Sequence, residues 1–113
     1  MLDMIKSSNE ISLIFDKGRR FSTPYLTLIV LRNEEQHGQP GRVAFIVGKK
    51  QGNAVWRNQA KRRMRSICRD IDGIISDCNI VYLAKQQLLN ERYDIVLECV
   101  EDRFSTIKEK VHG

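Results

Sequence analysis

The sequence is poor in the features that stabilise secreted and membrane proteins. It has only three cysteines in 113 residues, Cys68, Cys78 and Cys99, and none of them has CxxC spacing. We therefore expect reduced thiols, and a zinc site formed with His37 or His112 would match no common finger or ribbon. No apolar run approaches the ~18 residues of a membrane span, and the amino terminus lacks a secretory signal. These absences predict a cytoplasmic protein with no membrane partner.

Acidic residues are missing from residues 49–69, which is the most informative absence. Eight of the 19 Lys and Arg residues lie there, so the rest of the chain has 11 basic residues against 14 acidic ones. The net charge of +5 therefore comes from one stretch. Such a concentration of positive charge predicts a polyanionic partner. The alternative is a solvated helix surface, but that would normally include acids at i,i+4 spacing.

Length and hydrophobic patterning predict a single domain over residues 1–113. Apolar, β-branched runs predict strands at residues 25–31, 41–48 and 79–84, with the first two paired antiparallel. With the expected helices, the order is helix, strand, strand, helix, strand, helix. That order is typical of an α+β fold, in which helices pack on a small sheet.

Helices are expected at both ends of the chain. Ser7 has capping-box spacing to Glu10, and Gly18 is the expected stop of this first helix. Asn90 is the expected cap of the last helix. One face of that helix is apolar and comprises Tyr93, Val96, Leu97, Val100, Phe104, Ile107 and Val111.

The basic segment has the pattern of an amphipathic helix. Asn53 is its expected N-cap, and Gly52 permits a sharp turn before it. At about 100° per residue, one narrow stripe is apolar and is expected to pack on the sheet. It comprises Trp56, Ala60, Met64, Ile67 and Ile71. This placement favours core packing of Trp56 over stacking on a nucleic-acid base.

Beside the stripe lies a cationic sector. It comprises Arg57, Asn58, Lys61, Arg62, Arg65 and Arg69. Arg63 falls near the apolar stripe, where we expect its stem to lie on the sheet and its guanidinium to reach water. The helix amino terminus, with free N–H groups, would lie beside Lys49 and Lys50, and this combination predicts a phosphate site.

One run in this helix resembles the signature of the bacterial ribonuclease P protein subunit. It reads Gly52-Asn53-Ala54-Val55-Trp56-Arg57-Asn58-Gln59-Ala60-Lys61-Arg62, preceded by Lys49-Lys50. Members of that family have a basic helix with an Arg-Asn-Arg core and a following Lys-Arg pair. The resemblance extends over nearly the whole chain, because the other helices and strands occur in the family's order and at its spacing.

The resemblance implies an α/β sandwich similar to the second domain of ribosomal protein S5. Three helices would pack on a four-stranded sheet with a left-handed β-α-β crossover, an exception to the usual right-handed rule. It also implies a subunit of an endoribonuclease that removes the 5′ leader from precursor tRNA. The partners would be the catalytic RNA, at one protein per RNA, and the precursor tRNA. Magnesium would be bound mainly by the RNA.

The resemblance and the charge pattern together identify two sets of site residues. The expected RNA-binding set is Lys49, Lys50, Asn53, Arg57, Asn58, Lys61, Arg62, Arg65 and Arg69. The leader cleft implied by the family would include Phe15, Ile11, Ile29 and Lys85, although Phe15 at helical spacing is equally typical of a core residue. Asn53 needs no ligand if it only caps the helix. Gln59 replaces the second arginine of the core, so one contact should weaken.

The sequence contains no visible catalytic machinery for phosphodiester hydrolysis. Such chemistry needs a general acid and base, or two metals held by carboxylates. His37 and His112 form no arguable pair, and Asp70, Asp72 and Asp77 are more typical of a solvated helix end. We therefore expect no catalytic or metal-binding residue in this chain. The alternatives are a ribosomal-protein-like RNA-binding module with no role in cleavage and, less favoured by these residues, an independent nuclease.

Overall fold

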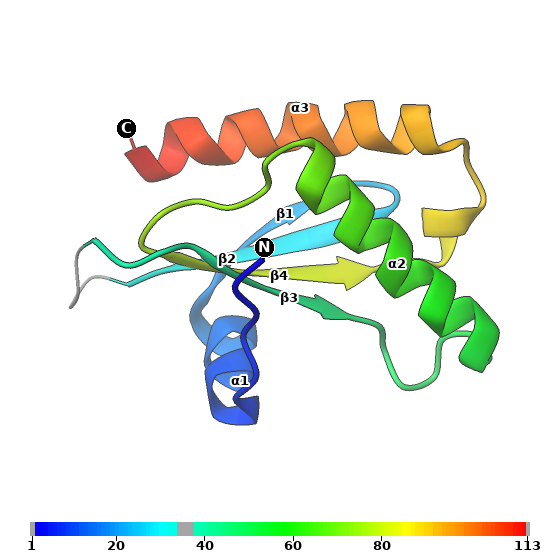
Figure 1. Cartoon of the computed structure of the whole chain (residues 1–113), viewed down its shortest axis with the longest axis horizontal. Coiled ribbons are helices and arrows are strands. Elements are labelled where there is room, and N and C mark those ends of the chain that lie inside the picture. The colour runs from blue at the N-terminus through cyan, green and yellow to red at the C-terminus, as the bar shows by residue number, and fades with distance from the viewer. Residues whose placement is uncertain (1, 34–37, 113) are drawn as a thin grey trace.

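A four-stranded sheet separates one helix from two others (Figure 1). The fold comes from a computed structural model that describes residues 2–33 and 38–112. In Figure 1, α1 lies on one side of the sheet, and α2 and α3 lie on the other. The elements are α1 (Ser8–Lys17), β1 (Arg19–Ser22), β2 (Leu26–Arg32), β3 (Arg42–Ile46), α2 (Ala54–Asp70), β4 (Cys78–Ala84), a 3-10 helix (Gln86–Leu89) and α3 (Tyr93–His112).

The strand order is β1-β2-β4-β3, so β4 lies between the two strands that were expected to pair. β2 is antiparallel to both β1 and β4, whereas β3 pairs with β4 in parallel. The predicted antiparallel pairing of residues 25–31 with 41–48 is therefore wrong. The physical reason lies in β4, where Ile80, Val81 and Tyr82 are fully buried. A strand that buries both faces needs a central position in the sheet.

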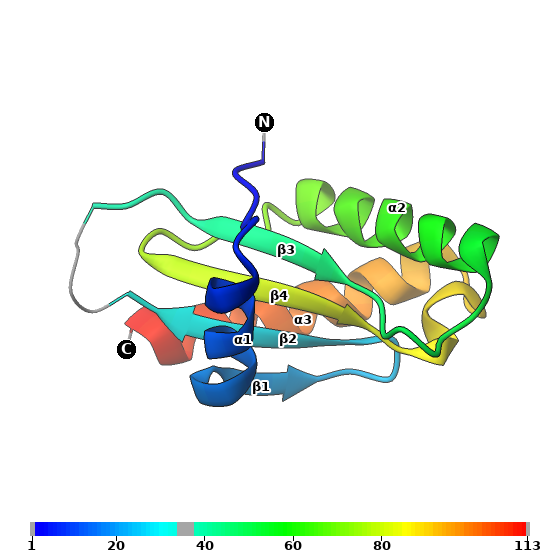
Figure 2. The ribbon, with the colours of Figure 1, turned by 90° about the horizontal axis from the view of Figure 1, so that it is seen from below.

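The connection from β3 through α2 to β4 is left-handed, as the family resemblance implied. Figure 2 views the sheet from the α1 side, where β3 and β4 point the same way and α2 lies behind them. The chain thus crosses the sheet with the opposite hand to most parallel β-α-β units. Residues 47–53 connect the end of β3 to the amino terminus of α2.

Two apolar clusters hold the layers together. The larger one lies between the sheet and the helices α2 and α3, and includes Met64, Ile67, Phe104 and Ile107. The smaller one lies under α1 and centres on Ile14, Ile29, Ala44 and Val81. The predicted apolar stripe of the basic helix is confirmed, since Ala60, Met64 and Ile67 are fully buried and Trp56 packs partly buried against the larger cluster.

The ends of α1 are those predicted from the sequence, whereas the start of α3 differs from the prediction. The backbone N–H of Glu10 donates to Ser7 Oγ at 3.4 Å, and Gly18 terminates α1. Asn90, however, ends the 3-10 helix, and α3 begins only at Tyr93. The prediction that Asn90 caps α3 is wrong because its side-chain amide donates to Gln87 Oε1, at 3.2 Å. The predicted apolar face of α3 is confirmed, with four of its seven residues, Val96, Val100, Phe104 and Ile107, fully or almost fully buried.

Candidate nucleic-acid interface

The chain turns sharply at residues 48–52 before α2 begins. Gly52 has φ +61°, a left-handed conformation that favours glycine, and a Cβ there would lie 2.9 Å from the Trp56 side chain. Asn53 caps the helix, because its Oδ1 accepts the backbone N–H of Trp56 at 2.9 Å. The exposed residues Lys49 and Lys50 lie in this turn. Both lysines therefore precede the helix amino terminus directly, as predicted.

Arg57 connects the first turn of α2 to the end of β3. Its guanidinium donates to the carbonyl oxygen of Gly48 and to that of Val47, the latter at 3.3 Å. The side chain is half-buried. Two of its donor atoms thus stabilise the turn, and the remaining donor capacity of the guanidinium stays available to a ligand.

The other cations of the predicted sector are exposed and not neutralised by the chain's own carboxylates. Lys61, Arg62 and Arg65 form no hydrogen bond or ion pair within residues 2–33 and 38–112. Lys49 and Lys50 are equally unpaired within those ranges. The Arg65 guanidinium lies over the Phe45 ring, 5.8 Å from its centroid. α2 therefore presents a set of positive charges with no internal counter-charge.

Arg69 is the partial exception at the end of this sector. It approaches Asp70 at 3.8 Å, with both side chains substantially exposed, and its guanidinium donates to Ser66 Oγ at 3.5 Å. Contacts this long and this exposed to solvent contribute little to stability. Arg69 can exchange them for a phosphate at small cost.

Arg63 has a structural role. Its guanidinium donates to the carbonyl oxygens of Leu88 at 3.0 Å and Glu91 at 2.7 Å, and lies 5.6 Å from the centroid of the Tyr93 ring. One nitrogen of this guanidinium is thus engaged by the protein itself, while the half-buried side chain also lines an open surface depression. Carbonyls at the end of the 3-10 helix lack helical partners, and Arg63 supplies their donors. It thereby ties α2 to the segment that leads into α3.

Asn58 and Gln59 lie on different sides of α2. Asn58 is exposed and forms no hydrogen bond within the part of the chain that the structure describes. Gln59 lines a shallow depression with Arg62, Arg63 and Tyr93, on the side of α2 that faces α3. Gln59 therefore lies outside the main cationic sector, as the helical wheel indicated. The role of each side chain toward RNA remains a prediction.

Of the four predicted leader-cleft residues, Ile11, Phe15 and Ile29 belong to the smaller cluster under α1. Figure 2 views the sheet from this side. Ile11 and Phe15 are partly buried against the smaller cluster. Ile29 is fully buried in it, so its side chain can support this surface but has no exposed area for a nucleotide. Lys85 follows Val81 and Leu83 in the strand alternation, which places it on the same face. Its ammonium donates to Ser22 Oγ at 2.6 Å and to the Thr23 carbonyl at 2.7 Å.

Sequence reasoning missed Arg20 as a member of this surface. Its guanidinium lies 5.7 Å from the centroid of the Phe15 ring and donates to the Phe15 carbonyl at 3.3 Å. The residue belongs to β1, a short strand in which Phe21 is buried and the other three residues are exposed. One buried residue in four is too weak a signal to reveal the strand from the sequence. Together, Phe15 and Arg20 place an aromatic ring and a cation side by side.

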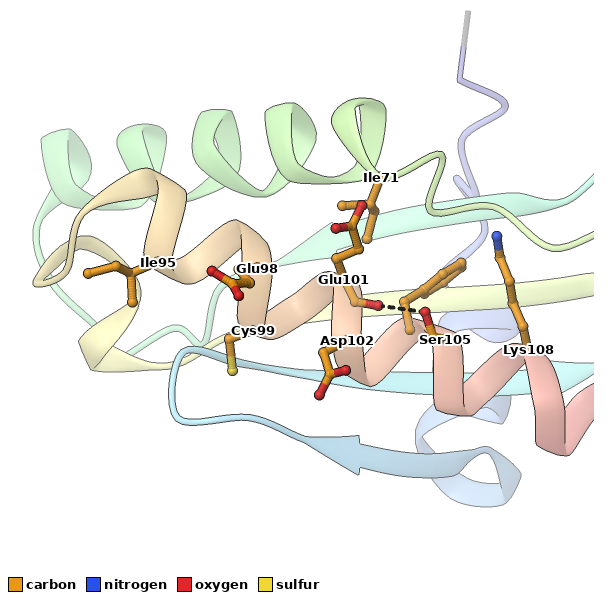
Figure 3. A pocket seen from close by; sticks show the side chains of 9 residues that line it. Ile71, Ile95, Glu98, Cys99, Glu101, Asp102, Ser105 and Lys108 are labelled. Atoms are coloured by element: carbon orange, nitrogen blue, oxygen red, sulfur yellow. Dashed lines mark hydrogen bonds between the residues drawn. The ribbon is translucent and has the colours of Figure 1, made fainter.

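The outer face of α3 has the opposite charge. A hollow of about 840 Å³ lies there. Figure 3 shows its lining side chains, Glu98, Glu101 and Asp102 among them. Ser105 Oγ donates to the Glu101 carbonyl at 3.2 Å within it. Three carboxylates and one cation, Lys108, line this hollow, so its charge does not favour a polyanion.

The shifted pKa values supply no base for RNA cleavage. Burial is the main cause that raises the pKa of Cys68, Cys78 and Tyr82. Burial, followed by the 2.6 Å hydrogen bond to Asp70, raises the pKa of Tyr93 to about 12. All four shifts favour the neutral thiol or phenol. None of these groups is therefore charged and ready to accept a proton near neutral pH.

Two acidic residues at or after the carboxyl-terminal end of α2 accept hydrogen bonds. Asp70 accepts the Tyr93 hydroxyl, and Asp77 Oδ1 accepts the Gln39 N–H at 2.7 Å. Among the residues described, no three His, Cys, Asp or Glu side chains gather as metal ligands. His37 and the side chain of His112 lie outside that description, so the zinc alternative involving them is not addressed. No described helix is long and apolar enough to cross a bilayer.

Comparisons with known proteins agree with this architecture. The family model described as ribonuclease P matches residues 2–108. The ribonuclease P protein component of Acholeplasma laidlawii is 35% identical over 95 residues, covering 83% of this chain and 79% of that protein. The corresponding protein of a Streptococcus pneumoniae strain is 35% identical over 83 residues. That match covers 73% of this chain and 65% of the relative, just under two thirds of its length.

Solved structures support the fold independently. The RNase P protein of Staphylococcus aureus superposes with a TM-score of 0.76 at 24% identity, covering 96% of this chain and 97% of that one. The RNase P protein of Thermotoga maritima gives a TM-score of 0.71 at 22% identity, covering 88% and 93%. The three helices, the mixed sheet and the matched sequence lead to one conclusion: this chain belongs to the ribonuclease P protein family.

Proposed function

We propose that this chain is the protein subunit of ribonuclease P, which binds the catalytic RNA and the 5′ leader of precursor tRNA. One observation supports this most strongly: α2 presents Lys61, Arg62 and Arg65 with no counter-charge among the described residues, beside a capped amino terminus. We further propose one protein per catalytic RNA, acting in the cytoplasm. The protein then assists removal of the leader to give mature tRNA 5′ ends.

The contribution of α2 is electrostatic. Each cation that meets a phosphate releases counterions, so binding should weaken steeply as salt increases. The helix amino terminus adds free N–H groups and the positive end of the helix dipole, beside Lys49 and Lys50. Asn58, unpaired and exposed among these charges, is suited to bind a phosphate or a ribose hydroxyl.

The α1 side of the sheet is suited to a single strand. Phe15 offers one aromatic face, and Arg20 beside it offers a cation, which is the combination that binds unpaired nucleotides without sequence preference. Ile11 adds apolar surface, while Lys85 can reach a phosphate if it releases Ser22. With a single aromatic ring among these residues, stacking should contribute less than the charge does.

We assign the chemistry of phosphodiester cleavage to the RNA. Asp70 at the end of α2 and Asp77 after it are hydrogen-bonded, and the described carboxylates do not converge with other ligands. The donor set therefore does not fit a magnesium cage, and we propose that the RNA holds the ions. The protein lowers the magnesium requirement because its cations neutralise phosphates that would otherwise repel one another.

Reconstitution with a bacterial ribonuclease P RNA and a precursor tRNA tests the proposal. Adding protein at low magnesium should raise the rate of 5′ cleavage, whereas Lys61→Ala/Arg62→Ala should raise it less. A ribosomal-protein-like module would bind equally well with and without a leader on the precursor, and would leave the rate unchanged. Unchanged turnover across a protein titration, or cleavage by protein alone, would overturn the proposal.

A further inference from the structure

A second cluster of positive charge lies at the opposite end of the sheet from α2. Four cations from four different elements converge there: Lys17 from α1, Arg19 from β1, Arg32 from β2 and Lys110 from α3. We propose that this cluster is a second RNA-contact site, which binds a phosphodiester segment independently of α2. The inference rests on the proposed function, because it takes RNA to be the partner.

The cations surround a cavity of about 720 Å³. That volume lies within the range of sites that enclose small ligands, and it is large enough to hold a nucleotide. Apolar side chains also line it, among them Phe21, Val30 and the exposed Leu13. Cations and apolar side chains in one cavity suit a nucleotide, which combines a charged phosphate with a flat, weakly polar base.

Among residues 2–33 and 38–112, none of the side chains that line the cavity is acidic. Lys17 and Lys110 are exposed and form no ion pair within the described part of the chain. Arg32 donates to the Val111 carbonyl at 3.0 Å, and the Arg19 guanidinium lies 5.4 Å from the centroid of the Phe21 ring. Neither contact cancels a charge. All four positive charges therefore act together on an anion in the cavity.

The site is separate from the interface on α2. Figure 2 places α2 beside β3, whereas β1 and the carboxyl-terminal end of α3 lie on the other side of the molecule. The phosphates bound along α2 therefore cannot also occupy this cavity. The RNA phosphodiester backbone is the occupant because it is the polyanion that α2 is suited to bind, and two contacts to one ribonucleoprotein strengthen each other through effective concentration.

Charge reversal at the two unpaired lysines tests the inference. Lys17→Glu/Lys110→Glu is compared with Lys6→Glu/Lys108→Glu, which makes the same change in net charge on exposed residues that do not line the cavity. Affinity and its salt dependence are measured for the catalytic RNA alone and for precursor tRNA added to the holoenzyme. We expect the cavity variant to bind one of these two RNAs at least about tenfold more weakly than the control variant does.

The RNA whose affinity falls, either the catalytic RNA or the precursor tRNA, is the one that occupies the cavity. The slope of log affinity against log salt should fall by about 1.4 to 1.8 for two lost contacts. Lys17→Gln/Lys110→Gln, which introduces no repulsion, replaces the glutamate variant if circular dichroism reveals misfolding. Equal affinity of cavity and control variants in both arms would overturn this inference alone. Failure of the unmodified protein to bind either RNA would overturn the proposed function as well.

Discussion

Arg57 donates from its guanidinium to the carbonyl oxygen of Gly48, so the first arginine of the basic helix also holds the turn before that helix. We expect Arg57→Ala to destabilise the fold by about 1 kcal/mol through the lost hydrogen bonds, and to weaken RNA binding as well. Lys61→Ala should weaken RNA binding while changing the free energy of unfolding by less than about 0.5 kcal/mol. Urea unfolding and RNA titration of both variants check this. Equal stability of the two variants would contradict the assigned role.

Two substitutions at Asn53 separate its role as the cap of α2 from a role in RNA contact. The first is Asn53→Ala. Loss of the bond to the Trp56 N–H should cost about 1 kcal/mol of stability, measured by thermal or urea unfolding. Asn53→Asp retains a capping oxygen, so stability should return. Its new negative charge beside the phosphate site should still lower RNA affinity. If the aspartate variant bound RNA as tightly as the unmodified protein, the helix amino terminus would not be a phosphate site.

Much of the basic helix could be predicted from the sequence because its signals are local. Gly52 and Asn53 define where α2 begins, and apolar residues at helical spacing define which side is buried. The strand pairing could not be predicted in the same way. Pairing depends on which strand can bury both faces, and this becomes clear only when all the strands are compared.

Long-range contacts account for the other differences. β1 is short and mostly exposed, so its pattern alone is too weak to identify it as a strand. The guanidinium of Arg63 binds the Leu88 and Glu91 carbonyls, which lie more than 20 residues away in the sequence. The cavity lined by Lys17 and Lys110 likewise forms only when the two ends of the chain meet. Counting charges along the sequence could not reveal it.

Tyr93 should titrate late because burial and Asp70 both favour its neutral phenol. Its pKa is raised from 10.0 to about 12, so its contribution to stability is complete below pH 10 and is lost as pH rises toward 12. Asp70→Ala should lower that pKa without restoring the ordinary value, since burial remains. Alkaline titration of tyrosinate absorbance, with Tyr93→Phe to assign the signal, measures it. An unchanged pKa in Asp70→Ala would argue against the hydrogen bond.

Gln59→Arg restores the arginine that the family pattern has at this position. The side chain is exposed beside Arg62 and Arg63, so the added charge should lower helix stability by only about 0.2 to 0.5 kcal/mol. If RNA reaches this side of α2, affinity should rise and the salt slope should steepen by about 0.7 to 0.9. Gln59→Lys is the matched control, because lysine adds the same charge without the planar guanidinium group of arginine. An unchanged slope would confine RNA to the main cationic sector.

Salt dependence of binding to the catalytic RNA tests the central claim most directly, namely that the unpaired cations of α2 neutralise RNA phosphates. Lys61→Ala/Arg62→Ala is compared with the unmodified protein and with Lys6→Ala/Lys108→Ala, which removes equal charge elsewhere. The slope of log affinity against log salt should fall by about 1.4 to 1.8 in the α2 variant and stay nearly constant in the control. A slope in the α2 variant equal to that of the unmodified protein would contradict the account.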